Sequence, residues 1–238
     1  MTDYDFLALI WWLLMWRIFA WLADTSRFHK KTLSYAMHEE RRRWMQLMAR
    51  RQTRLLDGHI IAGLQQSTSF FASTSLLAIG AGFGLLTAAD TLITAMESSL
   101  LHLTISREAF YIKVGVLMAL YAYAFFKFGW AYRLFNYCAV MIAATPEADE
   151  KDNVRNASAA AEMNIAASKQ FNYGLRSFFM SIPVLAWFLN PIAFALVATW
   201  VVLALAHRQF MSVPRRIARD AILGKGVEEA QKADVTGF

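Results

Sequence analysis

Residues 171–206 read FNYGLRSFFMSIPVLAWFLNPIAFALVATWVVLALA, two apolar runs on either side of Asn190-Pro191. Proline ends or kinks a helix at the residue before it, so this stretch is either one kinked helix or two membrane spans joined by a turn. Basic residues decide between the two, because they favour the cytoplasmic flanks of spans. They are dense after residue 26 and again after residue 206, and the connection between the second and third apolar runs holds only Arg107. An odd number of spans puts both basic regions on one side. The sequence therefore predicts the turn, with the N-terminus outside and the C-terminus in the cytoplasm.

Three other runs are long and apolar enough to cross a bilayer. The five predicted spans are residues 4–23, 60–89, 108–128, 171–189 and 192–206. A hydrophobic fraction of 57% is also high for a soluble domain. We therefore predict an all-α fold, a polytopic transmembrane helical bundle with long helices extending into the cytoplasm. Residues 1–223 form the single membrane domain, and residues 224–238 are a polar tail.

The third apolar run continues as far as residue 144, which as a helix is about 55 Å against a hydrocarbon core of about 30 Å. We therefore expect it to leave the membrane after residue 128. Thr145-Pro146-Glu147 supplies a capping hydroxyl, a proline at the first helical position and an acid in the first turn, which predicts the start of a returning helix. Residues 129–170 are expected to form a cytoplasmic helical hairpin. A small interfacial helix is expected within residues 90–106.

Residues 27–57 are predicted to form a basic amphipathic helix on the cytoplasmic side. Apolar residues recur on one stripe, and most arginines lie elsewhere on the helix surface. Such a helix either lies on an anionic membrane face or packs on neighbouring helices. Anionic lipid headgroups are the partner that the positive net charge beside apolar spans indicates, rather than nucleic acid. The predicted lipid-facing arginines are Arg41, Arg42, Arg43, Arg50, Arg51 and Arg54.

A polar patch inside the membrane is predicted between the second and fourth spans. Gln65, Ser69 and Ser73 are spaced by four residues and therefore share one helical face, as do Asn172 and Arg176. Unpaired polar groups are costly in lipid, so the first face must turn toward another helix or toward water. We expect Arg176 to donate to a glutamine or hydroxyl of the second span.

Two segments resemble a known membrane family. One is Arg43-Trp44 with Met48, followed by a second span that ends FASTSLLA at residues 71–78; the other is YGLRSFFMSIP at residues 173–183. Together they are similar to the family called domain of unknown function 599. The resemblance implies a bacterial or plant membrane protein, which we place in the bacterial inner membrane. It implies no activity and no site residues.

The chemical groups of the chain point to no reaction. The five histidines lack metal-ligand spacing, Cys138 stands alone, and no nucleophile motif appears. We therefore expect no enzyme, no cofactor and no metal. The predicted function is a binding, scaffold or assembly component that uses the basic cytoplasmic helix, with a second copy or another membrane protein as further partner. The alternative is an oligomeric channel or transporter subunit whose second span lines the path.

Overall fold

The computed structural model describes residues 2–99, 105–147 and 152–222, and these residues are all-α. The elements are α1 (Asp3–Asp24), η1 (Arg27–Lys31), α2 (Leu33–Ala49), α3 (Leu55–Thr87), α4 (Ala89–Glu97), α5 (Arg107–Ala143), α6 (Asn153–Trp187), α7 (Pro191–Phe210) and α8 (Val213–Ile222). The short helix α4 overlaps the segment 90–106, where the sequence predicted a small helix.

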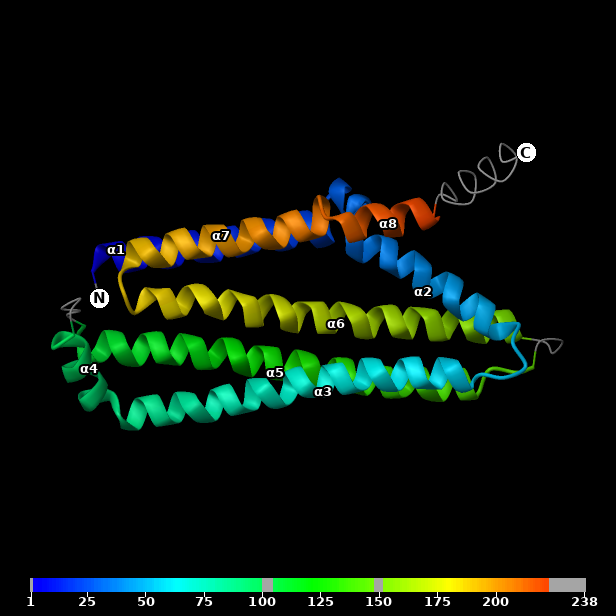
Figure 1. The fold of residues 1–238 in the computed structure, drawn as a ribbon, viewed down its shortest axis with the longest axis horizontal. Coiled ribbons are helices and arrows are strands. Elements are labelled where there is room, and N and C mark those ends of the chain that lie inside the picture. The colour runs from blue at the N-terminus through cyan, green and yellow to red at the C-terminus, as the bar shows by residue number, and fades with distance from the viewer. Residues whose placement is uncertain (1, 100–104, 148–151, 223–238) are drawn as a thin grey trace, which may run out of the picture.

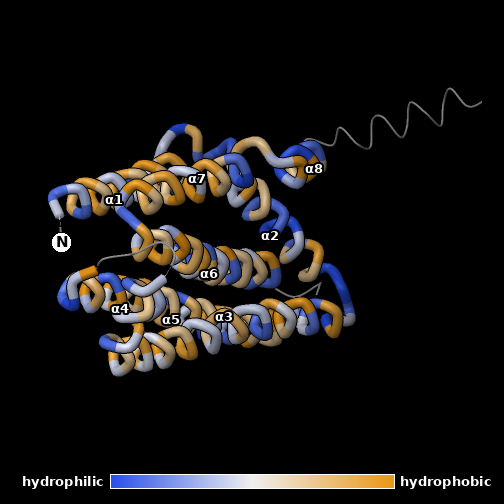
Figure 2. The backbone as a smooth tube through the Cα atoms, turned by 60° about the vertical axis from the view of Figure 1, so that its left-hand side comes forward, coloured by the Kyte–Doolittle hydropathy of each residue, from blue (hydrophilic) through white to orange (hydrophobic). Residues whose placement is uncertain are grey.

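The long helices lie side by side, with α6 between the α1–α7 pair and the α5–α3 pair (Figure 1). Helices α1, α5 and α7 run in one direction, and α3 and α6 run in the other. One end of the bundle carries α4 and the α6–α7 turn, and we call it the α4 end. The opposite end carries the α2–α3 turn, and we call it the α2 end. Hydrophobic residues dominate α1 and α7, whereas α2 and α8 are strongly hydrophilic (Figure 2).

Four segments are long and apolar enough to cross a membrane: Asp3–Asp24, Leu55–Thr87, Arg107–Ala143 and Pro191–Ile222. The protein therefore has the character of a multi-pass membrane protein. The predicted span 171–189 belongs to α6 and is not among the four. Polar side chains lower the hydropathy of α6, and several of them are buried against neighbouring helices, including Ser177 and Ser181.

The turn at Asn190-Pro191 is confirmed. Helix α6 ends at Trp187, and α7 begins at Pro191 and packs back on α6. The Asn190 side-chain oxygen accepts a hydrogen bond of 2.7 Å from the backbone N–H of Ala193, as an N-cap residue does. Proline at the first helical position needs no N–H partner, so the pair favours a new helix over a kink.

The single helix expected over residues 27–57 is wrong. Ser26 caps the short helix η1, and Thr32 then accepts a hydrogen bond from the Tyr35 N–H and starts α2 afresh. Helix α2 ends at Ala49, and α3 already begins at Leu55. The buried Asp57 fixes the turn between them, because its Oδ1 accepts from Trp44 Nε1 at 2.7 Å and from Arg51 Nη1 at 2.8 Å.

The helix start expected at residues 145–147 is also wrong. Thr145 donates its hydroxyl to the Met141 carbonyl at 2.8 Å and so closes α5 instead of opening α6. The carbonyl of Pro146 accepts from Asn153 Nδ2 at 2.8 Å, at the first residue of α6. Helices α5 and α6 nevertheless form the antiparallel pair that the hairpin prediction requires (Figure 1).

Close packing in α6 brings the layers together. Near the α2 end, alanines let α2 and α5 approach closely, namely Ala157, Ala160, Ala161 and Ala167. Nearer the α4 end, Trp187 stacks on Phe194 of α7 within a large aromatic and aliphatic core that also contains Trp12 and Phe19 of α1. In a membrane the hydrophobic effect does not drive helices together, so close packing through small residues contributes much of their association.

Candidate anion-binding cavity

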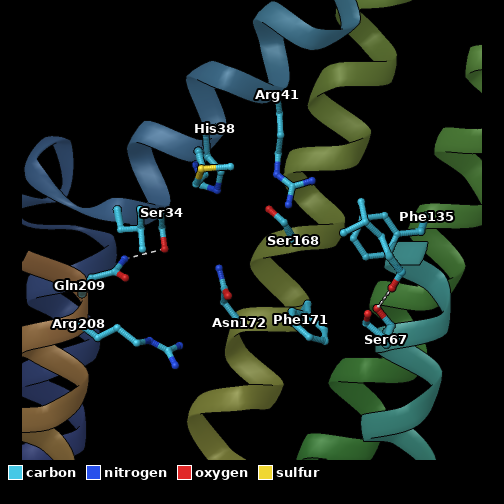
Figure 3. A pocket seen from close by; sticks show the side chains of 14 residues that line it. Ser34, His38, Arg41, Ser67, Phe135, Ser168, Phe171, Asn172, Arg208 and Gln209 are labelled. Carbon is cyan, nitrogen blue, oxygen red and sulfur yellow. Dashed lines mark hydrogen bonds between the residues drawn. The ribbon is translucent and has the colours of Figure 1, made fainter. Parts of the chain in front are cut away.

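A polar cavity of about 220 Å³ opens where α2, α3, α6 and α7 meet. Its polar lining comes mostly from three helices: Ser34, His38 and Arg41 of α2, Asn172 of α6, and Arg208 and Gln209 of α7. Figure 3 shows these side chains around one space, with the Arg208 side chain extending from α7 toward α6. The described lining contains two arginines and no aspartate or glutamate.

Arg41 supplies a half-buried positive charge in the cavity. One of its terminal nitrogens, Nη1, donates to the Oδ1 atom of Asn164, a neutral partner. Its Nε is buried without a hydrogen-bond partner, and none of the ion pairs among the described residues includes it. Burial lowers the pKa of Arg41 from its ordinary value, yet a guanidinium stays charged in proteins. A buried charge without a counterion is costly, so the cavity favours an anion.

His38 lies beside Arg41 in the cavity wall and is 6% exposed. Its Nε2 has no hydrogen-bond partner within the described part of the chain. Burial is the main cause that lowers its pKa to about 4, and the positive charges of Lys169, Arg41 and Arg42 add to it. The imidazole is therefore neutral at physiological pH and can donate one N–H to an acceptor.

The remaining polar groups are held in place by the helices that carry them. Gln209 Nε2 donates to Ser34 Oγ at 2.6 Å, which ties α7 to α2 across the cavity mouth. Ser168 and Asn172, one turn apart on α6, both line the cavity. The arrangement combines two guanidinium groups, an imidazole and neutral amides, which is the donor set that recognises a phosphate or another oxyanion.

The five residues of the predicted intramembrane patch do not come together. Gln65 Nε2 donates to Asn136 Oδ1 of α5 at 2.6 Å, while Ser69 and Ser73 are exposed on the outer face of α3. Asn172 lines the cavity. Arg176 bonds to no group of α3.

Arg176 pairs instead with Asp24, the last residue of α1. Two hydrogen bonds join the guanidinium to the carboxylate, Nη1 to Oδ2 at 2.5 Å and Nη2 to Oδ1 at 2.8 Å. The expected partner of Arg176 on the second span is therefore wrong, since its partner lies on α1. The sequence offers one signal for this pair, namely Asp24, an acid that directly follows the first apolar run.

The six arginines predicted to face lipid have different roles. Arg41 lines the cavity, and Arg42 bridges Glu39 and Glu162. Arg51 pairs with Asp57, and Arg54 donates to the carbonyls of Thr145 and Pro146, so both fasten turns at the α2 end. Only two remain on the outer surface of α2 and its C-terminus with at most a weak ion pair, namely Arg43 and Arg50.

Sequence reasoning also missed a buried ion pair near the α4 end. Lys113 of α5 is 5% exposed, and its Nζ donates to the Trp187 carbonyl at 2.8 Å and lies 3.8 Å from Asp5 Oδ1. Trp187 Nε1 donates to the same carboxylate at 2.7 Å. These contacts join α1, α5 and α6, and because every group is paired they describe a structural tie.

The fold and the cavity together define a multi-pass helical membrane protein with a cationic cavity between its helices. The chain belongs to the family described as protein of unknown function, DUF599, whose model matches residues 7–214. The resemblance drawn from the two sequence segments is thereby confirmed. No curated protein and no solved structure matches the chain.

Proposed function

We propose that the protein is a binding protein of the bacterial inner membrane, not an enzyme, and that its cavity holds a phosphate-type oxyanion carried by a lipid headgroup. The observation that carries the proposal is Arg41, a half-buried arginine whose Nε is buried and unpartnered, in a cavity that two arginines and no carboxylate line. An oxyanion would neutralise this charge and accept from the free donors of Arg41 and His38.

The proposed topology places the cavity near the cytoplasmic headgroups. We propose five crossings, with α6 as the fourth, because α6 runs between the other long helices from one end of the bundle to the other. The N-terminus is then outside and the C-terminus in the cytoplasm. Basic residues gather at the α2 end, which the positive-inside rule assigns to the cytoplasm.

Helix α8 supports a location at the membrane surface. Its exposed apolar residues include Val213 and Ile217, and its basic residues are Arg215, Arg216 and Arg219. An amphipathic helix with this composition lies in the interface and is attracted to anionic lipid. It packs beside α2, which lines the cavity.

The test is lipid binding by the full-length protein in detergent. Native mass spectrometry with phosphatidylglycerol and with phosphatidylcholine measures the preference for an anionic headgroup, and a thermal-shift titration with inorganic phosphate measures binding of the free anion. We expect Arg41→Gln to weaken phosphatidylglycerol binding by roughly 10- to 100-fold, since a hydrogen bond to a charged group contributes about 1.5–3 kcal/mol.

Arg43→Gln is the matched control, because it removes the same charge from the same helix outside the cavity. Equal losses in the two variants would mean that binding reflects net charge and not the cavity. If the protein binds inorganic phosphate as tightly as the lipid, the cavity is still an oxyanion site. Its ligand is then free phosphate and not a lipid headgroup.

A second candidate function is a subunit of an oligomeric channel or transporter. The observation that favours it is the outer face of α3, where Gln66, Ser69 and Ser73 are exposed in an otherwise apolar helix. Such a face needs a polar neighbour in a membrane. The mass of the assembly in detergent tests it, because a lone protomer offers α3 no helix with which to enclose a path.

A further inference from the structure

A second cationic space shares no lining residue with the cavity. This groove of about 410 Å³ is bounded by α1, α5 and α6, and its charged lining is Arg17, Asp24, Lys127 and Arg176. Three cations thus face one carboxylate. Tyr123 and Tyr173 complete the polar wall.

The charges in the groove are incompletely paired. Asp24 is engaged by Arg176 through two hydrogen bonds. Lys127 donates to the neutral Gln170 at 3.1 Å and lies over the rings of both tyrosines. Among the described residues, neither Arg17 nor Lys127 has a carboxylate within ion-pair distance. The groove therefore carries an excess of two positive charges.

A narrow space of about 30 Å³ lies between the groove and the cavity. Asn172 and Arg208 line both this neck and the cavity, and Arg176 lines both the neck and the groove. The one turn of α6 from Asn172 to Arg176 thus separates two cationic spaces. The Arg176 side chain is only 11% exposed, and the Asp24 side chain is 30% exposed toward the groove.

The wall of the groove also offers an apolar surface beside its charges. Leu13 and Trp16 line it next to Arg17, and the exposed residues Ile10 and Leu14 continue the surface along α1. A free phosphate cannot bury such an apolar surface. The acyl chains of a lipid can cover it while the phosphate of the headgroup reaches the cations.

We infer that the groove between α1, α5 and α6 is a second site for the phosphate of a lipid headgroup, in which Arg17 and Lys127 bind the phosphate and Asp24 is the resident counterion of Arg176. The inference rests on the proposed function for the class of ligand, a lipid phosphate. The cations of the groove, however, are different residues from those of the cavity that contains Arg41. In this arrangement Asp24 and the lipid compete for Arg176, and the carboxylate also repels the phosphate at short range.

The experiment is native mass spectrometry of the full-length protein titrated with phosphatidylglycerol. The wild type is expected to bind lipid at two classes of site. Arg41→Gln should remove one, and the double variant Arg17→Gln with Lys127→Gln should remove the other. Arg133→Gln is the control, since Arg133 is an exposed arginine of α5 outside the groove.

Asp24→Asn distinguishes a counterion from a purely structural tie. Removal of the competing charge should tighten lipid binding in the groove by about threefold or more, given that a unit charge near a protein surface at 4 Å acts with an energy well above RT. Unchanged or weaker binding in a folded Asp24→Asn protein would overturn the counterion role.

Separate outcomes identify failure of the site and of the proposed function. If the Arg17 and Lys127 double variant binds as much lipid as Arg133→Gln, the groove is not a site, whatever Arg41→Gln does. If Arg41→Gln alone has no effect, the proposed cavity fails and the groove stands. Inorganic phosphate that displaces the groove lipid at comparable concentration would overturn the lipid assignment.

Discussion

Packing strongly changes the protonation of His38. It faces Arg41 and Arg42 from its own helix, His29 from η1 and Lys169 from α6, and each of these charges lowers its pKa. Burial and these charges together hold its pKa at about 4, below the ordinary 6.5. The folded protein therefore keeps this imidazole neutral over a range in which an unfolded chain would protonate it.

This difference predicts an acid-sensitive stability. Between pH 6.5 and about 4 the unfolded chain binds a proton at His38 and the folded protein does not, so the contribution is fully present above pH 6.5 and is lost as the pH falls toward 4. The midpoint of thermal unfolding in detergent should fall over this range and fall less in His38→Gln. His59→Gln, which changes an exposed histidine of α3, should keep the wild-type slope. Parallel curves for wild type and His38→Gln would contradict the prediction.

Single residues also show what sequence reasoning could reach. That Arg176 is paired could be predicted, because an arginine in an apolar run requires a partner. Its partner Asp24 could not, since the choice among polar groups on other helices depends on which helices touch. Similarly, Arg41 is one of three consecutive arginines, and only the structure separates it from Arg42 and Arg43 by direction.

At the scale of elements, the α5–α6 contact depends on Gly174. A Cβ at this position would lie 2.6 Å from the ring of Phe128, which is itself fully buried. The side chain of Phe128 is fixed by rings on both sides, stacked with Phe71 of α3 and tilted against Phe171 of α6. The helices can approach at this level only because residue 174 has no side chain.

Gly174→Ala should therefore destabilise the protein by about 1–3 kcal/mol, as overpacking of a tight core does. Unfolding in a titration with denaturing detergent measures the change. Gly129→Ala is the matched control, because a Cβ there meets no atom within 4 Å and alanine is the better helix former. A Gly174→Ala protein as stable as Gly129→Ala would mean that α5 and α6 separate at no cost.

Helix boundaries were predicted well or badly according to whether residues next to the boundary determine it. The signal at Asn190-Pro191 is local, an N-cap followed by a proline, but it left a kinked helix possible, and the distribution of basic residues decided for the turn. Thr145-Pro146 carries the same local signal and fails, because the Thr145 hydroxyl binds the carbonyl behind it and the Pro146 carbonyl binds Asn153. The break within residues 27–57 depends on the tertiary position of Asp57, which no local pattern reveals.

At the scale of the whole molecule, hydropathy and packing give different counts of spans. The sequence predicts five, and four segments are apolar enough by composition. Helix α6 accounts for the difference, because a helix surrounded by protein can carry polar groups such as Ser177, whose hydroxyl donates to the Leu120 carbonyl of α5 at 2.9 Å. The proposed passage of α6 through the membrane therefore rests on the charge asymmetry at the ends of the helices.

The five-crossing topology predicts opposite locations for two surface positions. In a Cys138→Ala background, a cysteine in place of Glu97 after α4 should react with a membrane-impermeant thiol reagent in intact cells. A cysteine in place of the exposed Met211 between α7 and α8 should react only after permeabilisation. The native Cys138 is fully buried, and its replacement by alanine leaves the introduced cysteine as the thiol that the reagent can label. Labelling of both positions from the same side would require an even number of crossings between residues 97 and 211. The proposed three crossings by α5, α6 and α7 would then be wrong.

The tie between Asp5 and Lys113 sets an order of assembly. A chain is synthesised from its N-terminus, so α1 reaches the bilayer before α5 and α6 exist. Until then the Asp5 carboxylate lacks both Lys113 and Trp187, and hydrocarbon would be a costly place for it. The nascent α1 must therefore keep Asp5 near water, and it settles into its final depth only when the later helices arrive. Helix α1, made before α5 and α6, thus reaches its final position only after them.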